Sequence, residues 1–501
     1  MLETVLVANR GEIAVRIIRA CKILNIKTIA LFTDDDALSL SVKLADEAYS
    51  LGSGTVEETY LNVPKIVDLA SEAGADAIHP GYGFLSENSK FSLEINKKGL
   101  IFIGPSPEIL QSLGDKIEAR KLAKKCGIPI IPGSNGNISS LDEAEKVAEE
   151  IGYPIIIKAV FGGGGRGMEI VNSNESLEVA LMGCQAIAGN FFGSQEVFIE
   201  KYISSPKHIE FQFLADNHGN VIHLGDRECS IQRSHQKIIE EAPSFLSTQK
   251  RMEIGSDVCK MISDISYRNA GTVEFLWKEG KIYFNEINPR IQVEHPITEM
   301  ITGVDLVVQQ IRIARDEELQ YKQKDINFKG HAIEYRINAE DPLKSYLPQS
   351  GVVEELLIPG GHNVRFDSFL YPSCNIPASY DSLIGKLIIW GDNRQEAIER
   401  SMMALKELTI SGVKTNISLH QAILETKDFI NREVNTDFLD KARIKDILNH
   451  FEKMKLVATI SAYYMNKENQ KSSVISQKKD QQTINRWGLQ SKVEQQRNYP
   501  P

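Results

Sequence analysis

"VEFLWKEGKIYFNEINPRIQVEHP", residues Val273 to Pro296, is the stretch that most constrains the fold and chemistry of this chain. Two arms of alternating apolar and polar residues flank the turn "KEGK", which predicts a β-hairpin. Cross-strand pairing would place Glu274 and Glu286 on one face, with Asn288 on the same face two residues further on. Two carboxylates and an amide oxygen are hard ligands, suited to Mg²⁺ or Mn²⁺ that also holds substrate phosphates.

Polar residues continue at every second position after this hairpin. Arg290, Gln292 and Glu294 alternate with apolar residues, so we expect a single ionisable face over residues 286–294. A solvated sheet face is the alternative interpretation. A face built entirely from polar and ionisable groups is more typical of one that lines a site or water.

A second informative stretch is "KAVFGGGGRGM", Lys158 to Met168. The apolar run "YPIIIKAV" precedes the glycines and "RGMEIV" follows them, which predicts a hairpin rather than a linker. It is not a Walker A loop, because Met168 stands where Lys-Ser/Thr is required. Bare backbone N–H groups folding over phosphates, with Lys158 as a point charge, fit the pattern. A mobile surface hairpin is the alternative.

A third stretch, "SIQRSHQK" (Ser230 to Lys237), gathers Gln232, Arg233, His235 and Lys237, and we interpret it as one short loop. Such a loop is either an anion pocket or a solvated surface. His235 alone would be no argument for a site.

The N-terminal part alternates strand and helix patterns: "TVLVAN", "GEIAVRIIRACKIL", "KTIALFT", "ADAIHP" and "GLIFIGP". The alternation predicts βαβ units on a parallel sheet. Gly11 lies in a strand-to-helix turn, but G-x-G-x-x-G is absent, so a scaffold turn is favoured over a dinucleotide site.

Later segments show other patterns. The stretches "KIEARKLAKKCGIP" and "SLDEAEKVAEEIGYP" predict amphipathic helices, and "EVFIEKYI" predicts a strand. The end of the chain is polar and poor in aliphatic residues, which is typical of a flexible tail.

Composition excludes several classes of protein. The 501 residues are 42% hydrophobic and 25% charged, which is typical of a globular chain of several domains. A net charge of -10 argues against nucleic-acid or anionic-membrane partners. No leader and no apolar run of about 18 residues is present, so we expect a cytoplasmic protein. The six cysteines form no C-x-x-C pair, which favours reduced thiols.

Taken together, "ANRGEIA", "HPGYGFLSEN", "KA-x-x-GGGGRGM", "HIE-x-Q", "HQK" and "E-x-NPRIQVEHPITE" resemble the biotin carboxylases over about residues 1–446. The resemblance implies an α/β and α+β protein of the ATP-grasp class. Its expected parts are a Rossmann-like N-terminal domain (1–114), an ATP-grasp domain (115–330) with a small lid at about 132–203, a mixed α+β C-terminal domain (331–448), and a helical end with a polar tail (449–501).

The resemblance also implies roles for individual residues. The metal ligands would be Glu274, Glu286 and Asn288; bicarbonate would be surrounded by Lys237, Arg290, Gln292 and Val293; Glu294 would be the base, and Arg336 would face biotin. The catalytic set is therefore Lys237, Arg290, Glu294 and Arg336. The ATP-binding residues would be Lys116, Lys158, Gly162, Gly163, Gly164, Gly165, Gly167, Glu200, Lys201, Tyr202, Ile203, His208, His235 and Glu274.

The implied activity is an ATP-dependent ligase that carboxylates biotin through carboxyphosphate. The implied cofactors are ATP and two Mg²⁺ or Mn²⁺ ions. Biotin would be a substrate on a separate carrier protein, and a carboxyltransferase would be a further partner. The expected acceptor is acetyl-CoA or propionyl-CoA, with the biotin-carboxylating component of a two-subunit pyruvate carboxylase as the alternative.

Several residues depart from the pattern of the family. Ser234 and Asn285 replace an arginine and an apolar residue without removing a role. Ile23 and His362 replace a charged and an aromatic residue of the family's dimer contact, so the implied homodimer is less secure. Lys455 follows a methionine, as a biotinylated lysine does, but a helical pattern surrounds it, so we expect no biotin on this chain.

Two rivals remain open. Another ATP-grasp ligase would share the phosphate and metal sites but lack the "RIQVEHP" and "EYRINAEDP" pair. A non-catalytic nucleotide-binding protein would tolerate the loss of Glu294 or Lys237, both of which are present.

Overall fold

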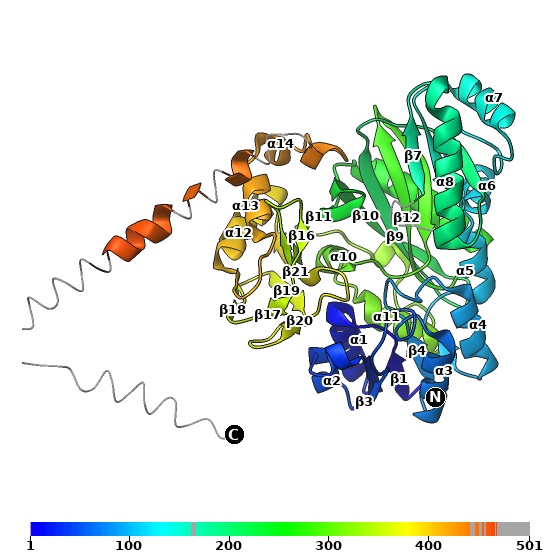
Figure 1. Ribbon diagram of the computed structural model, residues 1–501. Coiled ribbons are helices and arrows are strands. Elements are labelled where there is room, and N and C mark those ends of the chain that lie inside the picture. The colour runs from blue at the N-terminus through cyan, green and yellow to red at the C-terminus, as the bar shows by residue number, and fades with distance from the viewer. Residues whose placement is uncertain are drawn as a thin grey trace, which may run out of the picture. The chain divides into compact units, whose positions relative to one another are not determined.

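The N-terminal strands form a five-stranded parallel sheet in the order β3-β2-β1-β4-β5, as the alternating pattern predicts (Figure 1). The computed structural model describes residues 2–161, 167–440, 446–449, 453–454, 457–465 and 467. The sheet comprises β1 (Thr4–Val7), β2 (Lys27–Phe32), β3 (Glu47–Ser50), β4 (Ala77–His79) and β5 (Ile101–Phe102).

Both faces of this parallel sheet are buried. Val5 and Val7 of β1 pack with α1 (Gly11–Ile23), whereas Leu6 packs on the opposite side with α3 (Val63–Glu72) and α4 (Ser89–Lys97). Helices on both faces explain why the strands read as continuous apolar runs. Two further helices are α2 (Leu40–Leu44) and α5 (Pro107–Gly114).

The glycine-rich stretch lies between two paired strands. β6 (Ile155–Ala159) pairs antiparallel with β7 (Met168–Val171), with Lys158 opposite Met168. The predicted hairpin is therefore confirmed, while Gly162 to Gly165 lie outside the described residues. β8 (Val197–Lys201) completes this small sheet, against which α7 (Leu141–Ile151) and α8 (Leu177–Phe192) pack (Figure 1).

The largest sheet has eight strands in the order β13-β12-β9-β10-β11-β14-β21-β19, all antiparallel. It is continued beyond residue 330 by β14, which pairs with β11, so one sheet carries side chains from both sides of that point. Its strands are β9 (Lys207–Ala215), β10 (Val221–Arg233), β11 (Gln236–Ala242), β12 (Asn269–Lys278), β13 (Lys281–Asn288), β14 (His331–Asn338), β19 (Val364–Ser368) and β21 (Leu383–Gly391).

Helices and short strands complete the first compact unit, residues 1–444. The remaining helices are α6 (Lys116–Lys125), α9 (Thr248–Asp264), α10 (His295–Thr302), α11 (Leu306–Ala314), α12 (Arg394–Glu407), α13 (Ile417–Leu424) and α14 (Lys427–Ile430). The short strands are β15 (Glu340–Asp341), β16 (Leu347–Pro348), β17 (Gly351–Val352), β18 (Leu356–Leu357), β20 (Asn375–Ile376) and β22 (Thr409–Ile410).

Two local predictions are wrong. The stretch 230–237 is not one loop: β10 runs to Arg233 and β11 begins at Gln236, with only Ser234 and His235 in the turn, both at positive φ. The alternation after Asn288 is not a strand either, because β13 ends there and Glu294 is the N-cap residue immediately before α10.

The second unit, residues 445–501, is described only in part, and residues 446–449 and 457–465 of it are helical. Lys455 and the tail beyond residue 467 lie outside the described residues. Among the described helices, none combines the length and apolar character needed to cross a membrane.

Candidate active site

The hairpin of β12 and β13 places the two predicted carboxylates directly opposite each other. Glu274 pairs with Glu286 across the strands, as the sequence pattern predicts. Asn288 joins them, because its Nδ2 donates to Glu274 Oε1 at 2.9 Å. Burial, and then the neighbouring Glu274 charge, raises the pKa of Glu286. A divalent cation would relieve that repulsion, so this donor set fits the predicted metal.

Another group of possible metal donors adjoins the first. The ligand atoms of His208, Glu210 and Glu274 all lie within 4.8 Å of one another. His208 Nε2 is 3.0 Å from Glu274 Oε2. Glu274 is therefore common to both donor groups and lies at their junction.

Lys237 is the cation at the centre of the site. Its Nζ donates to Glu210 at 2.5 Å, Glu274 at 2.8 Å and Glu294 at 2.7 Å. Burial works against its charge, but the three carboxylates hold the pKa of Lys237 well above its ordinary value. It is a permanent cation at neutral pH.

Glu294 is held from two sides. Its Oε1 accepts from Lys237, and its Oε2 accepts from Arg336 Nη2 at 2.8 Å. Burial alone would raise the pKa of Glu294, but Lys237, Arg336 and Arg227 keep it well below the ordinary value. The carboxylate is therefore ionised and available as a base.

The remaining residues of the 290–294 stretch contact the same cluster from a loop. Arg290 Nε donates to Glu87 at 2.5 Å, and its Nη2 donates to Asn288 at 3.2 Å. Gln292 donates to Glu274 at 2.8 Å and accepts from the buried Arg227 at 2.7 Å. The predicted residues are thus brought together, although not by the strand alternation from which they were predicted.

Arg336 extends the cluster towards β11. Its Nε donates to Glu240 Oε1 at 2.6 Å while its Nη2 holds Glu294. Burial is the main cause that raises the pKa of Glu240 to about 7, partly offset by Arg336.

A cavity of about 370 Å³ opens beside the metal-type carboxylates. Lys158 Nζ is 2.7 Å from Glu200 Oε2, a carboxylate that also contacts Arg120. Burial, then the nearby charge of Lys116, lowers the pKa of Lys158 to about 7. Most of the described residues predicted to bind ATP line this cavity: Lys116, Lys158, Lys201, Tyr202, Ile203, His208, His235 and Glu274, together with Glu286.

Sequence reasoning missed the carboxylates and the arginine that support these groups. Glu210 lies between His208 and Gln212 on β9, and all three have polar side chains in a strand that is buried after its first residue. That alternation was a usable signal. Arg227 gave none, because its partners Glu210, Gln292, Gln212, Thr272 and Thr298 come from three other elements and the 290–294 loop.

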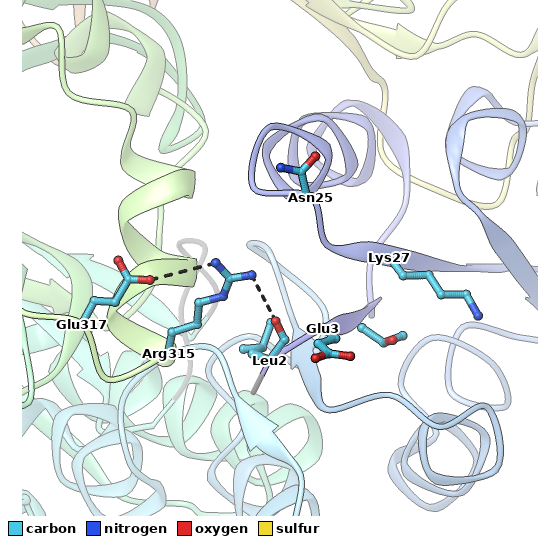
Figure 2. A pocket seen from close by; sticks show the side chains of 7 residues that line it. Leu2, Glu3, Asn25, Lys27, Arg315 and Glu317 are labelled. Atoms are coloured by element: carbon cyan, nitrogen blue, oxygen red, sulfur yellow. Dashed lines mark hydrogen bonds and ion pairs between the residues drawn. The ribbon is translucent and has the colours of Figure 1, made fainter.

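A second cavity, of about 720 Å³, is lined by residues from the start of the chain together with Arg315 and Glu317 (Figure 2). Arg315 donates to the carbonyl of Leu2 at 3.1 Å and lies 4.0 Å from Glu317. None of the predicted site residues lines this cavity.

Models of known protein families match three consecutive segments of the chain. Residues 1–110 match "Biotin carboxylase, N-terminal domain", residues 115–322 match "Carbamoyl-phosphate synthase L chain, ATP binding domain", and residues 334–441 match "Biotin carboxylase C-terminal domain".

Curated proteins match over most of the chain. A pyruvate carboxylase subunit of Methanothermobacter thermautotrophicus is 52% identical over 88% of this chain and 90% of its own length. Biotin carboxylase of Haemophilus influenzae is 50% identical over 88% and 99%. The 2-oxoglutarate carboxylase small subunit of Hydrogenobacter thermophilus is 48% identical over 92% and 98%.

Solved structures also match over most of the chain. The biotin carboxylase domain dimer of H. thermophilus 2-oxoglutarate carboxylase, in complex with MgADP, ADP and bicarbonate, gives a TM-score of 0.87 at 48% identity, covering 89% of this chain and 98% of that chain. The biotin carboxylase of Campylobacter jejuni in its β,γ-ATP complex gives 0.86 at 43% identity, covering 88% and 99%.

Proposed function

The chain belongs to the biotin carboxylase family, and we propose that it transfers a carboxyl group from bicarbonate to the biotin of a separate carrier protein at the expense of ATP. The position of Glu294 carries this proposal, because its two oxygens contact Lys237 and Arg336. The ionised carboxylate of Glu294 thus lies between Lys237, which also contacts the proposed metal ligand Glu274, and Arg336, which is assigned to biotin.

The cavity beside Glu274 is the proposed ATP site. Lys116, Lys158 and His208 would contact the phosphates together with the glycines 162–165 and Gly167. Residues 200–203 and His235 would hold the adenosine part, and most of these residues line the cavity. A cavity lined by both lysines and carboxylates suits a metal-bound polyphosphate.

Glu274, Glu286 and Asn288 would hold the Mg²⁺ or Mn²⁺ ions. When bound, these ions offset the charge that develops on the transferred phosphoryl group. The like charges of Glu274 and Glu286, opposed across the hairpin, support this assignment.

Glu294 is the proposed base for bicarbonate. Bicarbonate is a poor nucleophile until its proton is removed, so a carboxylate within hydrogen-bond reach must accept that proton as oxygen attacks the γ-phosphate. Arg290 would hold the planar oxyanion, and Lys237, Gln292 and Val293 would complete its surroundings. As Lys237 and Arg336 turn from Glu294 to the substrates, the pKa of Glu294 rises, which makes it a stronger base.

Arg336 is the proposed partner of biotin. Carboxyphosphate, formed when bicarbonate reacts with ATP, breaks down to CO₂ and phosphate. Biotin must lose its ureido proton before it attacks this CO₂. The departing phosphate is the natural base for that proton. Arg336 would stabilise the resulting ureido oxyanion, since a preorganised cation acts most strongly where charge develops.

The partners follow from this chemistry. A biotin carrier would deliver biotin, and a carboxyltransferase subunit would move the carboxyl group to the final acceptor. Acetyl-CoA and propionyl-CoA are the acceptors expected from the sequence. The relatives named for pyruvate and for 2-oxoglutarate favour a 2-oxo acid instead. A homodimer is proposed by similarity to the dimeric 2-oxoglutarate carboxylase domain.

The decisive assay combines the purified chain with MgATP, bicarbonate and free biotin. ADP release should require bicarbonate and should increase with biotin. Release that does not depend on bicarbonate would contradict the proposal and favour another ATP-grasp ligase.

A second experiment identifies the acceptor. The chain is tagged and purified with its bound partners, and this complex is supplied with labelled bicarbonate and, in separate reactions, with acetyl-CoA, propionyl-CoA, pyruvate or 2-oxoglutarate. Label in an acyl-CoA would exclude the 2-oxo acid assignment.

A further inference from the structure

Lys386 lies on β21 directly opposite Arg336 of β14. Residues directly opposite each other in an antiparallel pair project to the same face of the sheet. Both cations reach the same loop at consecutive residues. Arg336 holds the carboxylate of Glu294 at 2.8 Å, and Lys386 Nζ donates to the carbonyl oxygen of Val293 at 2.8 Å.

Lys386 also contacts the N-terminal part of the chain. Its Nζ is 3.1 Å from Glu12 Oε1, and the same oxygen accepts from the hydroxyl of Tyr82. Glu12 lies in the first turn of α1, and Tyr82 lies in the loop after β4. One ammonium group therefore connects three segments that are far apart in the sequence: α1 with the Tyr82 loop, the 290–294 loop, and β21.

The environment of Lys386 requires an explanation, because the side chain is completely buried at 0% exposure. Burying a charge is unfavourable unless it is paired and hydrogen-bonded. Glu334 on β14 lies nearby as well, and burial raises its pKa well above the ordinary value. Glu12 is the carboxylate in direct contact with Lys386, Asp367 of β19 lies directly opposite it across the strands, and the Val293 carbonyl is a further partner.

We propose that Lys386 is a positioning residue, which fixes the backbone at Val293 and thereby the carboxylate of Glu294, and which couples that loop to Tyr82 through Glu12. This inference rests on the proposed function, because it takes Glu294 as the base. Lys386 need not touch a substrate to act. A displacement of about 1 Å of a reacting group can lower a rate by about 10²-fold.

The test compares the parent with Lys386→Met, which keeps an unbranched side chain of nearly the same length and removes the charge. We expect the kcat of biotin-stimulated ADP release to fall by about 30- to 100-fold and the KM for bicarbonate to rise. The Kd for MgATP should stay within about twofold, since Lys386 does not line the nucleotide cavity. A merely structural role would not separate these constants.

Two further variants guard against a trivial folding defect. The double variant Glu12→Gln/Lys386→Met removes both members of this ion pair. Any loss of Tm in Lys386→Met should be smaller in the double variant, while kcat stays low and the KM for bicarbonate stays high. Lys65→Met is the matched control, because Lys65 also donates to a backbone carbonyl, that of Leu51, outside the site. It should leave the kinetic constants unchanged.

The outcomes separate the two proposals. A parent enzyme whose ADP release ignores bicarbonate would overturn the proposed function, and the role of Lys386 with it. An active parent with an equally active Lys386→Met variant would overturn the positioning role alone. Recovery of kcat together with Tm in the double variant would also overturn it, because Lys386 would then serve folding only.

Discussion

Glu294 Oε1 lies 2.7 Å from the Nζ of Lys237, and the same Nζ is 2.8 Å from Glu274 Oε1. The proposed base and a proposed metal ligand therefore share one cation. Any movement of Lys237 towards a substrate weakens its hold on both carboxylates at once. This contact links the proposed bicarbonate and metal parts of the site.

Glu294→Gln should remove the base while keeping the shape of the side chain. We expect the kcat of bicarbonate-dependent ADP release to fall by about 10²-fold or more, with the Kd for MgATP unchanged. Steady-state kinetics and a nucleotide titration measure the two quantities. Glu253→Gln, on the exposed side of α9, is the control. Parent-like turnover in Glu294→Gln would exclude this residue as the base.

Glu286→Gln should weaken metal-dependent nucleotide binding. A neutral amide is a poorer ligand for a hard dication, so the Kd for MgATP should rise by about tenfold or more. Binding of ATP in the presence of a chelator should change much less. Glu279→Gln, in the exposed turn of the same hairpin, is the matched control. An equal loss of affinity with and without metal would argue against a metal ligand.

MgATP binding should take up protons above pH 7. The pKa of Lys158 is lowered to about 7 in the free protein, first by burial and then by Lys116. A bound triphosphate raises it again, so at pH 8 a mostly neutral lysine becomes protonated on binding. The Kd should therefore increase as pH rises above 7.

Calorimetry at pH 8 in two buffers of different ionisation enthalpy measures this uptake. Lys158→Arg keeps the charge at all these pH values, so its binding enthalpy should no longer depend on the buffer. A parent enthalpy that is independent of the buffer would contradict the assigned pKa shift.

Arg336→Ala should separate the two halves of the reaction. Slow, bicarbonate-dependent ATP hydrolysis should remain, because Glu294 and Lys237 are still present. The stimulation by biotin should be lost, since Arg336 is assigned to the oxyanion that forms only when biotin reacts. ADP release with and without biotin measures both. Undiminished stimulation would remove Arg336 from the biotin site.

Arg227→Met should destabilise the protein. Arg227 is completely buried and donates to Glu210, Gln292 and three further side chains. Without Arg227 the buried Glu210 keeps only Lys237 as a cationic partner, and breaking a buried pair of this kind costs about 3–5 kcal/mol. Urea unfolding measures the loss, with the exposed Arg19→Met as control. A loss below about 1 kcal/mol would show that Lys237 alone satisfies Glu210.

The part of the site that the sequence predicts best is the part governed by local periodicity. Glu274 and Glu286 face each other because strand side chains alternate with a period of two around a short turn. Strand alternation also predicts that Glu294 lies on the same face as Glu286, but the reason is wrong. β13 ends at Asn288, and a loop leads from there to Glu294 at the start of α10.

What the sequence could not predict are contacts between distant segments. Glu87 reaches Arg290 from the N-terminal part, and Lys386 reaches Val293 from β21. No local pattern encodes such pairs, because each depends on how the sheets are placed. The glycines 162–165, which local pattern also singled out, lie outside the described residues, so their part in ATP binding remains a prediction.

Four of the cations assigned to substrates already hold a carboxylate of the protein: Lys158 with Glu200, Arg290 with Glu87, Arg336 with Glu240 and Glu294, and Lys237 with three glutamates. Small anions in the surrounding solution therefore meet no vacant positive charge among these groups. Chloride would have to displace a carboxylate of the protein with a single negative charge of its own. We therefore expect these glutamates to compete with abundant inorganic anions for the four cations, so that the site favours a ligand that exchanges several of these contacts together.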